Sequence, residues 1–259
     1  MKTGTQNKIK ALIVSLILFL GMEMMISFPE LITQIAVGVA VLIIPLTVIF
    51  LKVGIRSFAR ASCALTSLLF VGAAMLDLIF VEGFFFKQAY VIFVFACYFL
   101  LMGKFIGLKV LQIQHMAEDQ QYSIVDFTLL ATAFLYYVGF FGLFLYFQSF
   151  PLWLLLGLVF VTNFFLFFLF FYFNDIWLKK IWLYVFVLTF IVLEVTWALS
   201  YWPNGLLGRG IVLFCAYFLL SGLGKHYLKE SFSPKVLRGY LMVGVIVLAL
   251  VLSTGQWTY

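Results

Sequence analysis

The sequence predicts an all-α protein, a polytopic bundle of about nine transmembrane helices. Of its 259 residues, 66% are hydrophobic and only 10% are charged, whereas about 25% of the residues in a soluble domain are charged. The mean hydropathy of +1.18 agrees with this composition. So few charges could not cover the surface of a soluble domain of this size, which excludes the secreted, cytosolic and disordered classes.

Nine apolar stretches are long enough to cross a bilayer, since a transmembrane helix needs about 20 apolar residues. The longest gap between them, 108–124, has 17 residues, which is too short for an independent domain. We therefore expect residues 1–259 to form a single transmembrane domain. The expected spans are residues 9–28, 31–51, 62–83, 86–107, 125–148, 151–173, 181–201, 207–225 and 237–254.

Local signals at helix starts support two of these spans. Ser123-x-x-Asp126 has the pattern of a capping box and predicts the start of the fifth helix. Ser233 precedes Pro234, a proline suited to a first helical turn, and predicts the start of the ninth. Residues 109–119 are the one stretch expected to form a helix that does not span the membrane.

The distribution of basic residues predicts the orientation of the bundle. Cytoplasmic segments carry an excess of Lys and Arg in membrane proteins. With the N-terminus inside, 14 of the 16 basic residues fall in inner segments, and only Lys87 and Arg209 lie outside. This alternation predicts an N-in, C-out protein of the cytoplasmic membrane. The inner basic residues are Lys2, Lys8, Lys10, Lys52, Arg56, Arg60, Lys104, Lys109, Lys179, Lys180, Lys225, Lys229, Lys235 and Arg238.

Three acidic residues lie away from the ends of expected spans: Glu23, Asp77 and Glu194. An intramembrane charge costs about 2.5–3.5 kcal/mol on insertion scales and is a functional-site hypothesis by default. The topology places each acid about 4–8 Å beyond the middle of its helix, toward the outer face. Lys87 and Arg209 begin the helices that follow those of Asp77 and Glu194. These residues predict an outer polar pocket for a proton, a cation or an amphipathic cationic ligand.

Two interpretations remain open at these positions. The acids could instead be protonated or paired groups that hold helices together. Trp197 lies one helical turn after Glu194, and an acid beside an aromatic ring can hold a cation. The same Trp can equally anchor the helix at the membrane interface.

The region around Glu194 also carries a resemblance. Glu194, Trp197, the Leu199-Ser200 pair and Pro203 stand close together near the C-terminal helices. In this respect residues 190–225 resemble a loosely defined group of uncharacterised multi-pass bacterial membrane proteins. The resemblance implies a multi-pass membrane protein and no particular activity.

Two further features concern the interior of the bundle. Asn163 lies in the middle of the sixth span, where its amide is expected to bond to another helix. Ser-Phe-Pro occurs at 27–29 and again at 149–151, and Asp77 and Glu194 stand in the third and seventh spans. These offsets raise the hypothesis of two parallel four-helix repeats plus a ninth helix.

The sequence favours a non-enzymatic role. It contains no nucleophile elbow, phosphate-binding loop or zinc-protease motif. No catalytic residue, metal site or cofactor is predicted, because the three Cys and two His form no ligand pattern. The scattered basic residues predict no nucleic-acid partner, and the expected partner is the lipid bilayer.

The leading hypothesis is a carrier or binder that uses Asp77, Glu194 and Glu23 with Trp197, Arg209 and Lys87. The alternatives are a structural or assembly subunit and a lipid-modifying enzyme. The sequence does not determine the oligomeric state.

Overall fold

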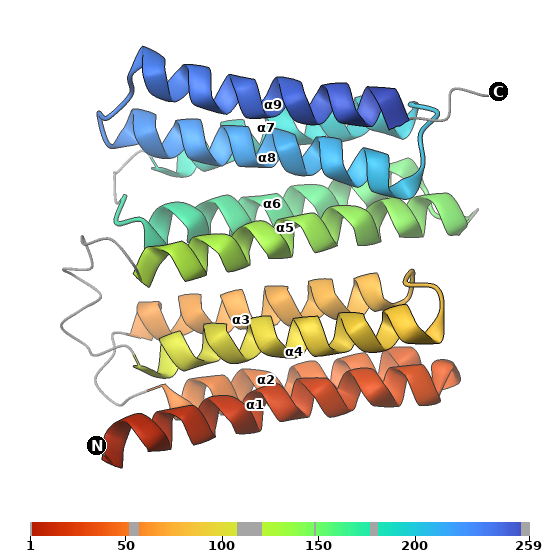
Figure 1. Cartoon of the computed structure of the whole chain (residues 1–259), viewed down its shortest axis with the longest axis vertical. Helices are drawn as coiled ribbons and strands as arrows, with labels where there is room; N and C mark the ends of the chain where they lie inside the picture. The colour runs from red at the N-terminus through yellow and green to blue at the C-terminus, as the bar shows by residue number, and fades with distance from the viewer. Residues whose placement is uncertain (1, 52–56, 108–120, 148, 177–180, 255–259) are drawn as a thin grey trace. The chain divides into compact units, whose positions relative to one another are not determined.

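Nine long helices make up most of the residues that the computed structural model describes (Figure 1). It describes residues 2–51, 57–107, 121–147, 149–176 and 181–254, which contain no strand. A short 3-10 helix, Pro29–Leu31, precedes α2. The helices are α1 (Lys2–Ser27), α2 (Ile32–Phe50), α3 (Ser57–Leu78), α4 (Phe84–Gly107), α5 (Gln121–Tyr146), α6 (Leu152–Phe173), α7 (Ile181–Ser200), α8 (Leu206–Leu228) and α9 (Pro234–Thr254).

Each of these helices is long and apolar enough to cross a membrane. The nine candidate spans have 20 to 23 residues, and their mean hydropathy runs from 1.7 to 2.6. This confirms the predicted all-helical fold class with nine spans among the described residues. Large apolar side chains such as Ile49 and Val245 are 69% and 65% exposed. Such an apolar surface fits an integral membrane protein in contact with lipid.

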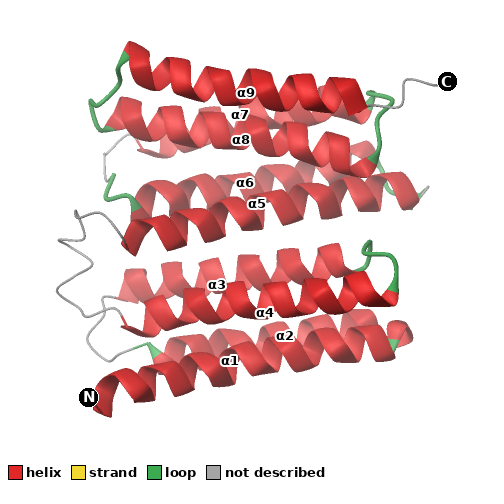
Figure 2. Ribbon diagram, viewed as in Figure 1, coloured by secondary structure: helices red, strands yellow, loops and turns green. Residues whose placement is uncertain are grey.

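The third helix differs most from its expected span. It covers Ser57–Leu78, whereas residues 62–83 were expected. Ile79, Phe80 and Val81 are apolar, so hydropathy alone extends the span through them. Their amides instead close short turns back onto Leu76, Asp77 and Leu78. Gly83 then turns the chain into α4 at φ +80°, a conformation that favours glycine (Figure 2).

The two predicted helix starts have different outcomes. At α9 the expectation is confirmed, because the amide of Val236 donates to Ser233 Oγ at 3.3 Å and the helix begins at Pro234. At α5 the helix is described from Gln121, two residues before Ser123, and the Ser123 side chain lies outside the described residues, so the capping box stays a prediction. The expected connecting helix at 109–119 lies outside the described residues. The same holds for the inner basic residues Lys52, Arg56, Lys109, Lys179 and Lys180.

The chain divides into two compact units, residues 1–132 and 133–259. In unit 1, α1 packs against α4 and α2, and α3 packs against α2 and α4. Its interior contains hydroxyl groups as well as apolar side chains. Ser67 Oγ lies 2.5 Å from Tyr98 Oη and 3.5 Å from Thr47 Oγ1. This hydrogen-bonded cluster joins α2, α3 and α4.

Unit 2 contains the second half of α5 and helices α6 to α9. Helix α7 packs against α6 and α8, and α9 packs against α8. Tyr137 Oη donates a hydrogen bond to Asn163 Oδ1, and the Asn163 amide donates to the Val159 carbonyl at 2.8 Å. The predicted interhelical bond of Asn163 is thereby confirmed. Tyr217, on α8, packs edge-on against the Tyr137 ring, with 6.2 Å between the ring centroids.

Candidate functional site

The six residues predicted to form a binding site belong to both units. Each unit is therefore described by itself. Unit 1 holds two of the three acids predicted to lie within the membrane and one of the two cations predicted to lie outside. The residues in unit 1 are Glu23 on α1, Asp77 on α3 and Lys87 on α4. Those in unit 2 are Glu194 and Trp197 on α7 and Arg209 on α8.

Glu23 is held by a side chain of α4. Gln88 Nε2 donates a hydrogen bond to Glu23 Oε2 at 3.2 Å, and both side chains are half-buried. The bond is possible because α1 and α4 pack along each other in unit 1. Gln88 was not predicted. An amide near the start of an apolar span was the signal that could have identified it.

Asp77 is the most enclosed of the three acids, with 8% of its surface exposed. Tyr90, on the second turn of α4, donates its hydroxyl proton to the Ala74 carbonyl at 3.0 Å. The same hydroxyl interacts with the Asp77 carboxyl group. Within the described part of unit 1, no cation pairs with Asp77. Lys87 is half-buried, and among the described residues it makes no hydrogen bond or ion pair with either acid.

The two acids of unit 1 lie at the same end of the unit. A Cβ atom on Gly21 would lie 3.4 Å from the Met75 methyl, so α1 and α3 meet at these residues. Both helices end shortly afterwards, and each acid follows its contact residue by two positions. Gln88 and Tyr90 then reach α1 and α3 from the start of α4. We call Glu23, Asp77, Gln88 and Tyr90 the acidic end of unit 1.

In unit 2 the acid has a different environment. Glu194 is exposed on α7 and has no hydrogen-bond or ion-pair partner among the described residues. Trp197 is 54% exposed, and its ring packs edge-on against Tyr201, with 5.7 Å between centroids. The aromatic side chain predicted to flank Glu194 thus contacts a second ring one turn further along.

Arg209 is buried, with 7% of its surface exposed, and it closes the α7–α8 turn. Its Nε donates to the Asn204 carbonyl at 2.9 Å, and its Nη1 donates to the Ser200 carbonyl at 3.3 Å. The guanidinium also lies 6.0 Å from the centre of the Phe141 ring. The bond to Ser200 satisfies a carbonyl at the C-terminal end of α7, where a positive charge is favourable, and the bond to Asn204 satisfies a carbonyl of the turn. Within unit 2, Arg209 therefore binds backbone oxygen rather than Glu194.

The side chains at the acidic end can accept and donate hydrogen bonds and can carry negative charge. They comprise two carboxyl groups, an amide and a phenol, a set that suits a proton or a small cation. Among the described residues, no three His, Cys, Asp or Glu side chains are grouped so that they could hold a metal ion. Cys63, Cys97 and Cys215 form no disulfide.

Comparison with known proteins identifies a family without assigning a function. No curated protein and no solved structure matches the chain. A family described as a protein of unknown function, DUF5656, matches residues 21–254. The match includes eight complete helices and the end of α1 with Glu23, so it covers the acidic end of unit 1 as well as unit 2. Since it takes in most of the chain, this protein belongs to the DUF5656 family.

Proposed function

We propose that the protein is a membrane carrier or binder of a proton or a small organic cation, and that the acidic end of unit 1 is its binding site. The observation that carries this proposal is the burial of Asp77 with no cation paired to it among the described residues of unit 1. Glu23 supplies a second carboxyl group at the same end, oriented by Gln88.

The physical reason is the cost of an uncompensated charge. A carboxylate at the centre of a membrane-spanning helix costs about 2.5–3.5 kcal/mol. Asp77 is the second-last residue of α3, where part of this cost remains because the side chain is buried. A bound proton or a bound cation neutralises the carboxylate and removes this cost. An acid without a paired cation can therefore release its proton when a cation binds. Tyr90 adds an aromatic face and a hydroxyl, which suit an organic cation. The scarcity of polar residues in the spans argues against a large polar substrate.

The orientation of the site is part of the proposal. The excess of Lys and Arg in alternate turns supports an N-in, C-out topology in the cytoplasmic membrane. In that topology the acidic end opens toward the outside. A cation would then enter from the external medium.

Binding to purified protein in mild detergent tests the proposal. The probe is tetraphenylphosphonium, a lipophilic cation, titrated at several pH values. We expect wild type to bind it at neutral pH and release it in acid, and Asp77→Asn to bind at least about tenfold more weakly, the effect of one lost contact of about 1.4 kcal/mol. Glu194→Gln is the matched control, because it removes an exposed intramembrane acid and should leave binding unchanged.

Infrared difference spectroscopy on the same proteins distinguishes a proton from an organic cation. A carboxylic acid band that appears on acidification and is lost in Asp77→Asn, without phosphonium binding, would identify the proton as the ligand. If wild type binds no phosphonium and shows no such band, the proposal is wrong.

One observation favours a second candidate, a structural or assembly subunit. Gln88 already bonds to Glu23 and Tyr90 already bonds to Ala74, as polar groups that hold helices together do. On this alternative, Glu23→Gln and Asp77→Asn lower the melting temperature and change no binding. On the carrier proposal, Asp77→Asn changes binding and leaves the melting temperature nearly unchanged.

We further propose that the single transmembrane domain consists of two four-helix repeats followed by α9. The motif Phe-x-x-Tyr-Phe-Leu-Leu-x-Gly occurs at 95–103 in α4 and at 214–222 in α8. Its Phe packs edge-on against a Phe of the first helix in each unit. The Phe19–Phe95 centroids are 5.7 Å apart at 73°, and the Phe134–Phe214 centroids are 5.6 Å apart at 77°. The carrier site would then belong to the first repeat.

A further inference from the structure

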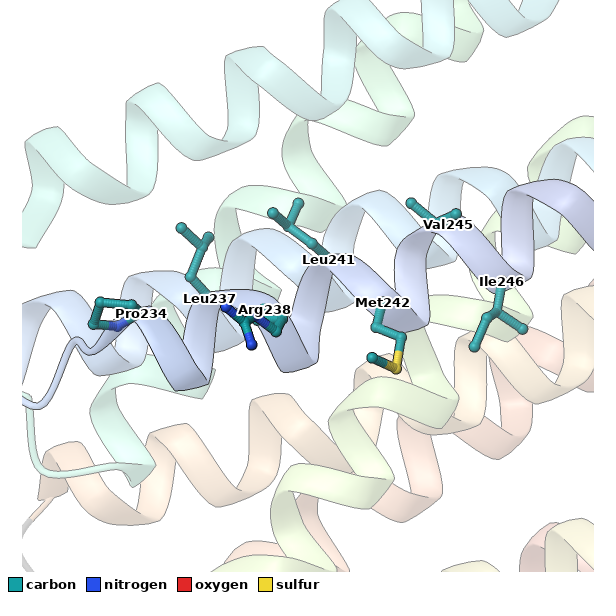
Figure 3. Close-up of a pocket in the computed structure, with 7 residues that line it drawn as sticks. All are labelled: Pro234, Leu237, Arg238, Leu241, Met242, Val245 and Ile246. Carbon is teal, nitrogen blue, oxygen red and sulfur yellow. The ribbon is translucent and has the colours of Figure 1, made fainter.

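Helix α9 carries an apolar groove along its exposed face (Figure 3). The groove has a volume of about 470 Å³. Apart from one arginine near its beginning, the side chains that line it are apolar. After Pro234 they are Leu237, Arg238, Leu241, Met242, Val245 and Ile246.

The groove lies on the side of α9 that α8 does not cover. Tyr240 packs against Phe218 with 5.4 Å between ring centres, and a Cβ atom on Gly244 would lie 3.0 Å from Leu219. These contacts define the face toward α8. At about 100° per residue, Met242 is rotated about 200° from Tyr240 around the helix axis, so the two residues lie on nearly opposite sides of α9. Met242 is accordingly 58% exposed.

Two cations stand at the beginning of the groove. Lys235 and Arg238 are three residues apart, so they lie on one face of the helix. Both are exposed, and neither makes a side-chain hydrogen bond or an ion pair with a described residue. Arg238 and Met242 are adjacent on that face, so the cationic end leads directly into the apolar groove (Figure 3).

The length of the groove matches one leaflet of a bilayer. From Pro234 to Ile246 the helix rises about 18 Å at 1.5 Å per residue. Half of the hydrocarbon core of a bilayer is about 15 Å thick. An acyl chain that runs along the groove therefore places its headgroup at Lys235 and Arg238.

We propose that this groove is a binding site for one anionic phospholipid. The phosphate binds Lys235 and Arg238, and an acyl chain lies against Leu241, Met242 and Val245. Charge complementarity selects the lipid, since each basic side chain near the membrane surface attracts an anionic headgroup. A guanidinium can also bind a phosphate with two parallel hydrogen bonds. The inference is independent of the proposed carrier function.

A second copy of the chain fits this face less well. Two copies in one membrane have the same orientation, and a two-fold interface brings the same surface of each together. The α9 helices would run parallel, with Lys235 and Arg238 of one copy beside those of the other. Four cations would then repel one another where the groove begins.

Native mass spectrometry of the full chain in mild detergent tests the site, with phosphatidylglycerol and phosphatidylcholine as probes. We expect wild type to retain one phosphatidylglycerol and not phosphatidylcholine. Lys235→Gln and Arg238→Gln should each weaken binding about fivefold, and the double variant about thirtyfold. The matched control is Lys8→Gln, which removes another exposed cation expected at the same membrane surface.

Three results would overturn the proposal. One is equal retention of both lipids by wild type. Another is a loss of phosphatidylglycerol binding in Lys8→Gln as large as in Arg238→Gln, because general surface charge and not a defined site would then explain the binding. The third is a dimer that Val245→Trp dissociates while lipid retention stays unchanged, which would assign the groove to a second copy. All four side chains are exposed, so unchanged melting temperatures would show that each variant is folded.

Discussion

The beginnings of α4 and α8 perform the same task with different chemistry. Tyr90 and Arg209 are 119 residues apart, as are the motif tyrosines Tyr98 and Tyr217. Tyr90 bonds to the carbonyl of Ala74 in the last part of α3. Arg209 bonds to the carbonyl of Ser200, the last residue of α7. Each side chain ties the fourth helix of its unit to the end of the third.

The difference lies in what remains for a ligand. Arg209 directs its charge to backbone oxygens and pairs with no acid in the described part of unit 2. Tyr90 stands beside a buried carboxyl group with which no described cation of unit 1 pairs. Two residues earlier in each helix, at the same spacing of 119 residues, α4 has Gln88 and α8 has the exposed Leu207. A binding site can therefore exist in one unit while the other keeps only the structural contact.

The largest expected effect is on the α7–α8 turn. Arg209→Met removes two hydrogen bonds from a charged donor and leaves carbonyls without a partner. We expect a loss of about 2–4 kcal/mol in the free energy of unfolding. Tyr90→Phe removes one neutral hydrogen bond and should cost about 1 kcal/mol. Denaturant unfolding in detergent micelles measures both.

Arg209→Lys serves as the control, because it keeps the charge and loses the two-pronged geometry, so its cost should lie between the other two. Equal losses for Arg209→Met and Tyr90→Phe would show that the two positions do not differ in this way.

The glycine that ends the repeated motif gives the second comparison. A Cβ atom on Gly222 would lie 2.3 Å from the Tyr240 ring, so α9 packs on this residue. Gly222→Ala must displace the ring, and overpacking of this kind costs about 1–3 kcal/mol. Gly103, its counterpart, has no described atom within 4 Å of such a Cβ. Gly103→Ala should stabilise the helix by up to about 1 kcal/mol.

Thermal unfolding of the two variants in detergent checks this pair. A melting temperature that falls equally for both would contradict the assignment of α9 as an addition to the second repeat. If Gly222→Ala alone is destabilised, Tyr240→Ala in the same chain should restore part of the loss, because it removes the ring that the methyl group meets.

Much of the architecture could be predicted from sequence because the bilayer imposes it. Apolar length and the alternation of basic turns predict nine spans, and the bilayer requires each span to be a helix. The end of α3 could not be predicted in this way. Ile79, Phe80 and Val81 are as apolar as the helix before them, and hydropathy does not show that their amides close short turns instead of continuing the helix.

The candidate site was less accessible to sequence reasoning. Hydropathy draws attention to Glu23, Asp77 and Glu194, but it cannot distinguish the buried Asp77 from the exposed Glu194. Gln88 and Tyr90 become relevant only through the contacts of α4 with α1 and α3. Arg209 was expected beside an acid, since a charge suggests a countercharge. Its partners within unit 2 are backbone carbonyls. Every residue has a backbone carbonyl, so the residue types in the sequence do not identify such a partner.

The smallest expected effect concerns the buried hydroxyl clusters. Tyr98→Phe leaves Ser67 with Thr47 as an alternative partner. Tyr137→Phe removes the hydrogen bond to Asn163 Oδ1, and that side chain is fully buried. Interhelical bonds in membranes average about 0.6 kcal/mol, with a maximum of about 1.7. We expect Tyr98→Phe near the average and Tyr137→Phe near the maximum.

A double-mutant cycle with Asn163→Leu separates the bond from the packing of the ring, because it removes both polar partners. Coupling between Tyr137 and Asn163 that exceeds the coupling between Tyr98 and Ser67 would place the more rigid core in unit 2. Equal couplings would argue against this difference. The proposed carrier function favours an adaptable unit 1, since the unit that binds the cation has to exchange it.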